Sequence, residues 1–118
     1  MPILQGLKAV TFFVDDPKAV GEWYHALLDS APIRSSENLV LLRAESFELA
    51  FHRRDFSEVE NQSSVVPYFS VGNLDLAITL LLQMGARIRR QPMRTEEGSR
   101  IAQVIDPFGN TIGLLESP

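Results

Sequence analysis

Short stretches in which apolar and polar residues alternate recur along the chain and predict strands. Successive side chains of a strand point to opposite faces, so one face can meet a core while the other meets solvent or a ligand. Residues 46–52 are the clearest case, because apolar residues at 47, 49 and 51 alternate with Glu48, Ala50 and His52. The same pattern predicts strands over residues 7–14, 33–35, 38–43, 65–71 and 86–90.

A helix is predicted after the first strand. Asp16-Pro17 marks its start, because Asp accepts hydrogen bonds from the first free amides and Pro fits the first helical position. Apolar residues then recur at helical spacing as far as Leu27. We expect this helix to end near Asp29, before Pro32.

A second helix is predicted over residues 74–84. Asn73 is its expected N-cap, and Gly85 is expected to close it in the left-handed conformation. The apolar spacing predicts an inner face made of Leu76, Ala77, Leu80 and Met84.

The sequence Asp-Pro-Phe-Gly-Asn at residues 106–110 predicts a tight turn between two closing strands. Pro presets one backbone angle, Gly and Asn tolerate positive φ, and Asp can bond to the amides of its own turn. Apolar residues flank the turn on both sides, as in a hairpin. Polar residues at 53–64 and 91–98 are expected to form surface loops.

The predicted order is strand, helix and three strands, followed by the same order again. Residues 11–14 (Thr-Phe-Phe-Val) also parallel residues 68–71 (Tyr-Phe-Ser-Val). We therefore predict an α+β fold of two βαβββ modules in one domain, 1–118. The first module covers residues 1–55, a linker covers 56–64, and the second module covers 65–118.

Charge and composition exclude several classes of function. The 118 residues carry a net charge of −4, which argues against a nucleic-acid partner. They include no cysteine, which excludes thiolate metal sites and disulfides. No apolar run is long enough to span a membrane. We expect a cytoplasmic protein with no membrane partner.

This architecture resembles the vicinal oxygen chelate superfamily, which includes glyoxalase I, extradiol dioxygenases, fosfomycin-modifying enzymes and bleomycin-resistance proteins. The ending Asp-Pro-Phe-Gly-Asn-x-Ile-x-Leu-x-Glu at 106–116 carries the resemblance, together with Trp23-Tyr24 where relatives often have Phe-Tyr. It implies curled mixed sheets around a ligand cavity, usually across a homodimer.

The resemblance also implies four positions that bind a divalent metal in metal-dependent members. They fall here on Ala9, Glu48, Val66 and Gly113. Of these only Glu48 has a side chain that can ligate a metal, and a stable site needs three or four protein ligands. We therefore expect no metal and no cofactor, and no metal-dependent glyoxalase or dioxygenase activity.

Strand alternation and the resemblance together predict which residues line the cavity. The predicted ligand-binding residues are Phe13, Glu48, His52, Tyr68, Ser70 and Leu115. Glu48 and His52 are also the candidates for acid–base catalysis, although the position of His52 at the strand end favours a place on the rim. Glu48 is expected to do one of three things: pair with an arginine such as Arg43, take up a proton, or wait for a cationic or hydrogen-bond-donating ligand.

Two residues on the first helix are assigned no ligand role. Trp23 is expected in the core or at a dimer interface, and His25 is expected to be exposed.

Three functions are compatible with these residues. The first is a homodimeric, metal-independent binding protein that sequesters an aromatic or cationic small molecule, as in the bleomycin-resistance branch. The second is a metal-independent lyase, isomerase or dioxygenase-like enzyme with Glu48 as general base. The third is a degenerate member that serves protein–protein contact.

Overall fold

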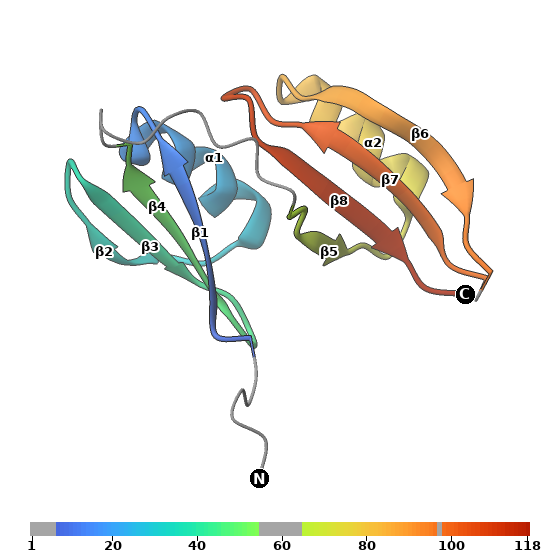
Figure 1. Ribbon diagram of the computed structural model, residues 1–118, viewed down its shortest axis with the longest axis horizontal. Coiled ribbons are helices and arrows are strands. Elements are labelled where there is room, and N and C mark those ends of the chain that lie inside the picture. The colour runs from blue at the N-terminus through green and yellow to red at the C-terminus, as the bar shows by residue number, and fades with distance from the viewer. Residues whose placement is uncertain (1–6, 55–64, 97) are drawn as a thin grey trace, which may run out of the picture. The chain divides into compact units, whose positions relative to one another are not determined.

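The computed structural model describes residues 7–54, 65–96 and 98–118 and divides the chain into two compact units, Met1–Asn61 and Gln62–Pro118. Each unit is one four-stranded mixed sheet with one α-helix against one face (Figure 1). The predicted α+β class and the two βαβββ modules are confirmed. Both sheets are open, and a cavity enclosed by them stays a prediction. The predicted linker, 56–64, lies outside the described residues.

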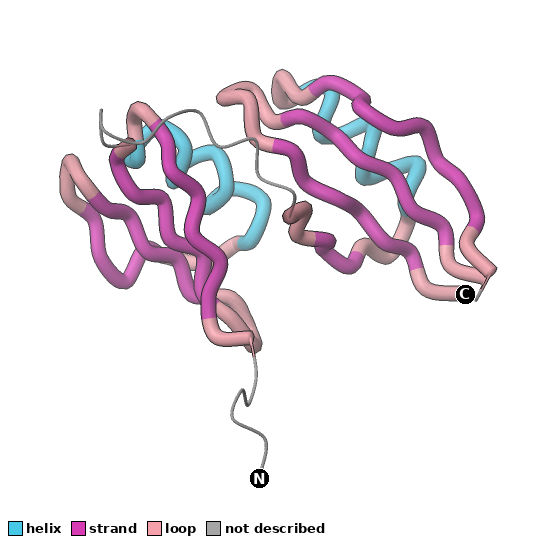
Figure 2. Tube along the Cα trace, viewed as in Figure 1, coloured by secondary structure: helices cyan, strands magenta, loops and turns pink. Residues whose placement is uncertain are grey.

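The first unit contains the elements predicted for it, with ends that differ by at most two residues. Their order is β1 (Ala9–Val14), α1 (Pro17–Leu28), β2 (Pro32–Ser35), β3 (Leu39–Arg43) and β4 (Glu48–Arg53). Across the sheet the order is β1-β4-β3-β2, with β1 parallel to β4 and the other pairs antiparallel (Figure 1). Figure 2 shows the strands and the helix of this unit by colour.

Helix α1 begins and ends on polar caps. The carboxylate of Asp16 accepts a hydrogen bond from the backbone N–H of Ala19 at 3.2 Å, and Asp29 ends the helix in the left-handed conformation with φ 53°. His25, which was expected to be exposed, is half-buried instead. Its Nδ1 contacts the carbonyl oxygen of Ser30, just beyond the helix end, so this ring belongs to the C-terminal cap.

The core of the first unit is aromatic. The ring of Tyr24 on α1 stacks with Phe12 of β1 and Phe51 of β4, at centroid distances of 5.9 and 5.0 Å. Trp23 is half-buried and meets Tyr24 edge-on at 4.8 Å. The helix therefore covers the face of the sheet that carries Phe12 and Phe51, and the opposite face is left open.

The second unit repeats this arrangement. Its elements are β5 (Tyr68–Ser70), α2 (Leu74–Gln83), β6 (Arg87–Arg94), β7 (Arg100–Ile105) and β8 (Thr111–Glu116). The sheet order is β5-β8-β7-β6, with β5 parallel to β8. Strand β5 is shorter than the predicted 65–71, because Pro67 has no N–H to donate.

The predicted loop over 91–98 was wrong, because β6 continues through Pro92 to Arg94. Pro is tolerated in a strand at the edge of a sheet or at a bulge, and β6 has both features. It pairs only with β7, and its register shifts between Arg90 and Met93.

The predicted inner face of α2 was also wrong. Leu74, Ile78 and Leu81 are the buried residues, whereas Leu76 is 55% and Leu80 is 48% exposed. Helix α2 is apolar on most sides, so the spacing of its leucines does not determine which side meets the sheet. The two caps were predicted correctly, since Asn73 accepts from the N–H of Leu76 at 3.0 Å and Gly85 has φ 97°.

The turn between β7 and β8 forms as predicted, around a buried aspartate. The carboxylate of Asp106, 2% exposed, accepts from the backbone N–H groups of Phe108 and Asn110 at 2.9 and 2.8 Å. Gly109 adopts φ 94°. Among the described residues, no helix has both the length and the apolar character needed to cross a membrane.

Candidate functional site

The open face of each sheet, the face that its helix does not cover, holds the predicted site residues. In the first unit the register places Ala9 of β1, Glu48 of β4 and Arg43 of β3 in one row, called here the Glu48 row. Four residues further along β4, His52 lies beside Phe13. The other predicted residues, Tyr68, Ser70 and Leu115, share the open face of the second sheet.

Glu48 is already paired with a basic side chain. Arg43 Nη2 donates to Glu48 Oε2 at 3.1 Å, and the side chain of Glu48 is only 17% exposed while that of Arg43 is 65% exposed. Of the three alternatives left open by the sequence, the structure shows the first, an arginine beside this carboxylate. A hollow of about 200 Å³ at the β3–β4 turn borders the pair and is mainly polar.

His52 and Glu48 do not form an acid–base pair. Four residues along a strand separate their Cα atoms by about 13 Å. The Nδ1 of His52 donates to the carbonyl oxygen of Arg53 at 2.8 Å, and its ring lies 5.7 Å from that of Phe13. Phe13 is 46% exposed, so this end of the open face presents an aromatic surface.

In the second unit, one row crosses all four strands. This Tyr68 row consists of Tyr68, Gly113, Gln103 and Arg90. Gln103 Nε2 donates to the hydroxyl oxygen of Tyr68 at 2.9 Å. The phenol ring lies over Gly113, where an added Cβ atom would come within 2.6 Å of ring atoms. The ring of Tyr68 therefore packs directly on Gly113.

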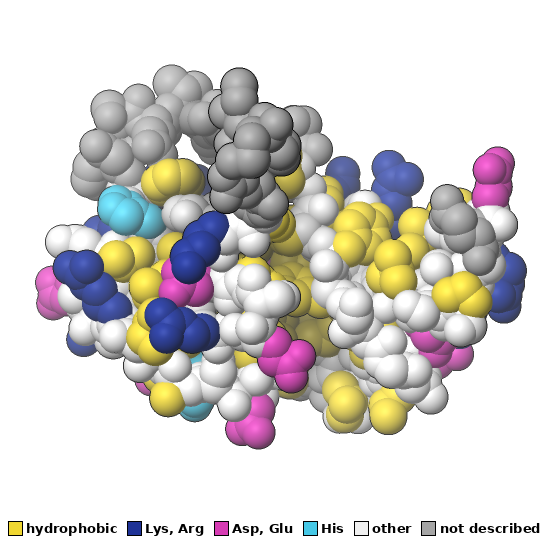
Figure 3. Space-filling view, turned by 90° about the horizontal axis from the view of Figure 1, so that it is seen from below, with side chains coloured by type: hydrophobic (Ala, Val, Ile, Leu, Met, Phe, Trp, Pro, Cys, Tyr) yellow, Lys and Arg dark blue, Asp and Glu magenta, His cyan; other side chains and the backbone are white. Residues whose placement is uncertain are grey.

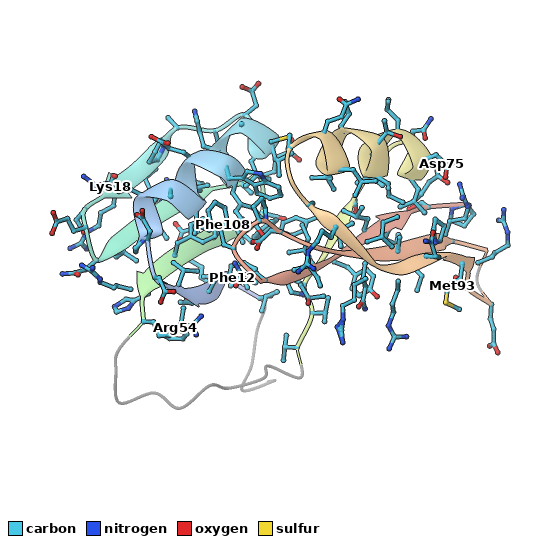
Figure 4. All side chains as sticks on the ribbon, turned by 90° about the horizontal axis from the view of Figure 1, so that it is seen from above. Phe12, Lys18, Arg54, Asp75, Met93 and Phe108 are labelled. Carbon is cyan, nitrogen blue, oxygen red and sulfur yellow. The ribbon has the colours of Figure 1, made fainter. Side chains whose placement is uncertain are left out.

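A second row on the same face is mainly apolar. This Leu115 row consists of Ser70, Leu115, Ile101 and Met93. Met93 is 55% exposed, and Figure 4 shows it on the side of the sheet away from α2. On the half of Figure 3 that shows the second unit, hydrophobic side chains gather with Lys or Arg side chains beside them.

A small hollow of about 40 Å³ opens between the two rows. It is lined by Tyr68, Arg90, Gln91, Met93, Ile101, Ala102 and Gln103. Sequence reasoning identified Tyr68 but missed Gln103, Arg90 and Met93. The alternation of polar Gln103 with buried Ala102 and Val104 was a usable signal, whereas Arg90 and Met93 flank a bulge that the sequence does not reveal.

Backbone hydrogen bonds show which positions of the two units correspond. The N–H of Glu48 donates to the carbonyl of Lys8 at 3.0 Å, and the N–H of Gly113 donates to the carbonyl of Pro67 at 2.8 Å. In each unit the acceptor is followed by the position that corresponds between the units. This position is Ala9 in the first unit and Tyr68 in the second. Tyr68, two residues beyond Val66, is therefore the structural counterpart of Ala9.

These positions do not fit a divalent metal. Ala9 and Gly113 have no donor atom, Glu48 is engaged by Arg43, and the hydroxyl of Tyr68 is engaged by Gln103. Within residues 7–54, 65–96 and 98–118, no three His, Cys, Asp or Glu side chains are grouped as a metal site requires.

Comparison with known proteins gives one family and many structures of similar fold. Residues 6–114 match the family model described as Glyoxalase/Bleomycin resistance protein/Dioxygenase superfamily. The comparison with curated proteins gives no match.

Three solved structures illustrate the likeness. A glyoxalase/bleomycin resistance protein/dioxygenase family enzyme from Burkholderia phytofirmans has a TM-score of 0.83 at 19% identity, covering 97% of this chain and 100% of that one. A glyoxalase-related enzyme from Fulvimarina pelagi has a TM-score of 0.77 at 18% identity, covering 98% of this chain and 90% of that one. A lactoylglutathione lyase from Agrobacterium tumefaciens has a TM-score of 0.70 at 15% identity, covering 96% of this chain and 94% of that one. At these identities the likeness concerns the fold alone.

Proposed function

The chain belongs to the Glyoxalase/Bleomycin resistance protein/Dioxygenase superfamily, and on that premise we propose that it is a metal-independent protein that binds an aromatic small molecule. The observation that carries the proposal is the state of the positions that bind metal in metal-dependent relatives. Their side chains either lack donor atoms or are engaged within the protein, as Glu48 is by Arg43. A site of this kind can bind a ligand but has no free group positioned to ligate a divalent ion.

Exposed aromatic and apolar groups on the open faces support an aromatic ligand. Phe13 is 46%, Tyr68 is 42% and Met93 is 55% exposed. Small-molecule sites combine such surfaces with a few fixed polar groups, and the Tyr68–Gln103 hydrogen bond supplies one. A cationic ligand is less well supported, because the carboxylate that would receive it, Glu48, already has a cationic partner.

A thermal-shift screen of the purified chain tests this proposal. Aromatic compounds that bind the folded state should raise the melting temperature, because they stabilise that state by mass action. The shift should be the same with a chelator and with added Zn²⁺, Ni²⁺, Mn²⁺ or Fe²⁺, and elemental analysis should find no stoichiometric metal. A bound equivalent of metal would contradict the proposal.

This screen, followed by product analysis for each compound that binds, separates the other two functions from this one. Conversion of a ligand to product, lost in Glu48→Gln, would identify an enzyme that uses Glu48 as general base. The absence of any stabilising compound would favour a member that serves protein–protein contact.

A further inference from the structure

Positive charge in the second unit is gathered on two neighbouring strands. The basic residues between 65 and 118 all lie on β6 and β7, and they are Arg87, Arg89, Arg90, Arg94 and Arg100. Arg100 is neutralised by ion pairs to Asp75 at 3.1 Å and to Glu116 at 3.6 Å. Among the described residues, no carboxylate lies within ion-pair distance of Arg87, Arg89 or Arg90.

The fold singles out Arg90 from this group. The register of β6 against β7 shifts on both sides of it, between Ile88 and Arg90 and between Arg90 and Met93. Such irregularities bend a strand and redirect a side chain, and they are frequent beside binding sites. Arg90 lies opposite Gln103 in the Tyr68 row and lines the hollow, whereas Arg89 does not line it.

Two side chains that line the hollow can donate hydrogen bonds to a ligand. The guanidinium of Arg90 only donates. The hydroxyl of Tyr68 accepts from Gln103 Nε2 at 2.9 Å, which leaves its own proton free to be donated. No Asp or Glu lines the hollow. Two donors beside an opening without carboxylates are suited to an anionic oxygen.

The size of the hollow suits a carboxylate rather than a ring. One water needs about 15 Å³ of such space, so a hollow of about 40 Å³ accommodates a group of two or three heavy atoms. An aromatic ring attached to that group would lie outside the hollow, over the Leu115 row. Exposed Met93 and half-buried Ile101 offer it an apolar surface there, and thioethers contact aromatic rings favourably.

We infer that the open face of the second sheet binds an aromatic carboxylic acid. Its carboxylate enters the hollow and receives hydrogen bonds from Arg90 and from the hydroxyl of Tyr68. Its ring lies against Met93 and Ile101. This inference rests on the proposed small-molecule function and names the class of its ligand.

Calorimetric titration with a matched pair of probes tests the inference. 2-Naphthoate and 2-naphthamide share a ring system, but only the first carries a negative charge. We expect the full chain to bind the acid about 10-fold or more tightly than the amide, as a charge-assisted hydrogen bond requires. Arg90→Gln should abolish this preference, and Tyr68→Phe should reduce it.

Arg89→Gln is the matched control. It removes the same charge from the same strand but from outside the hollow, so the preference for the acid should remain. Equal loss in Arg89→Gln and Arg90→Gln would overturn the inference, because the effect would then come from overall charge. Equal binding of acid and amide to the unaltered chain would also overturn it but would leave the proposed function standing. If neither probe and no other aromatic compound bound, both would fail.

Discussion

Corresponding positions of the two sheets carry different residues and pack differently. In β4 the side chain of Glu48 is present and paired with Arg43. In β8 the counterpart, Gly113, has no side chain, and the ring of Tyr68 occupies the space above it. Gly113 is therefore a packing requirement of Tyr68.

Gly113→Ala should destabilise the fold. The added methyl group would come within 2.6 Å of the Tyr68 ring, and overpacking of this kind costs about 1–3 kcal/mol. Chemical denaturation measures the loss in the free energy of unfolding. In the Tyr68→Ala background the cost should fall by at least about 0.5 kcal/mol, as for any pair in direct contact.

Gly72→Ala serves as the control for this prediction. A Cβ atom at Gly72 would meet nothing within 4 Å, and its φ lies outside the left-handed region. It should leave the free energy of unfolding nearly unchanged. A cost of Gly113→Ala that persisted in the absence of the Tyr68 ring would mean that backbone, and not the ring, sets the requirement for glycine.

Glu48→Gln should affect stability slightly and ligand binding not at all. The pair with Arg43 is partly exposed, and such pairs contribute about 0.2–1 kcal/mol. Denaturation and calorimetry on the same variant give both quantities. Weakened binding with unchanged stability would show instead that the ligand, and not Arg43, is the functional partner of this carboxylate.

The sequence predicts some of these residue contacts and not others. Alternation along residues 46–52 was enough to place Glu48 on the open face, with Arg43 among its possible partners. The Tyr68–Gly113 contact was not predictable, because a glycine in a strand reveals only a missing side chain. Which neighbouring ring fills the space depends on the register of β5 against β8.

At the scale of elements, α2 is tied to its sheet by a chain of polar contacts. Glu116 Oε1 of β8 accepts from the backbone N–H of Leu74 at 3.1 Å, which satisfies a free amide at the start of α2. Arg100 of β7 forms ion pairs with Glu116 and with Asp75, and Asp75 lies on the first turn of the helix. Figure 4 shows Asp75 at this end of α2.

This network predicts a pH dependence of stability. Hydrogen bonds from Arg100, and then its charge, lower the pKa of Asp75 below the ordinary value. A lowered pKa in the folded state contributes stability above the ordinary aspartate range, about pH 4, that is lost as the pH falls through the folded-state value. The free energy of unfolding should therefore fall less steeply below pH 4 in Asp75→Asn than in the unaltered chain. Identical slopes would show that the Arg100 contact is not maintained in solution.

Element types were more predictable than element faces and edges. Local signals such as Asp16-Pro17, Asn73 and the Asp-Pro-Phe-Gly-Asn turn act through neighbouring backbone groups, so the sequence contains all that is needed. The buried side of α2 and the extension of β6 through Pro92 depend on which strand lies alongside. Both features depend on tertiary contacts, which the periodicity of a single segment does not determine.

At the scale of the whole molecule, duplication explains why each half carries its own sheet and helix. The two βαβββ modules were predictable from the repeated pattern alone, but the strand order of each sheet was not. The class of the inferred ligand was not predictable either, because it depends on Arg90 and Met93, which flank the bulge in β6.

Exposed apolar residues predict that the chain forms a homodimer. Phe13 on the open face of the first sheet is 46% exposed, and Leu76 on α2 is 55% exposed. Large continuous apolar patches usually mark an interface, and a specific interface buries at least about 1,000 Å² in total. Sedimentation at micromolar concentration should therefore give twice the 13.2 kDa chain mass.

Two matched substitutions identify the face that forms this dimer. A charge buried in an interface without a partner weakens association strongly. If the open sheet faces pair, Phe13→Glu should shift the protein to a monomer while Leu76→Glu leaves the dimer intact. The reverse result would place the interface on α2 and leave the open faces free for ligand. A monomer without either substitution would contradict the prediction and mean that ligand binding relies on the residues of one chain.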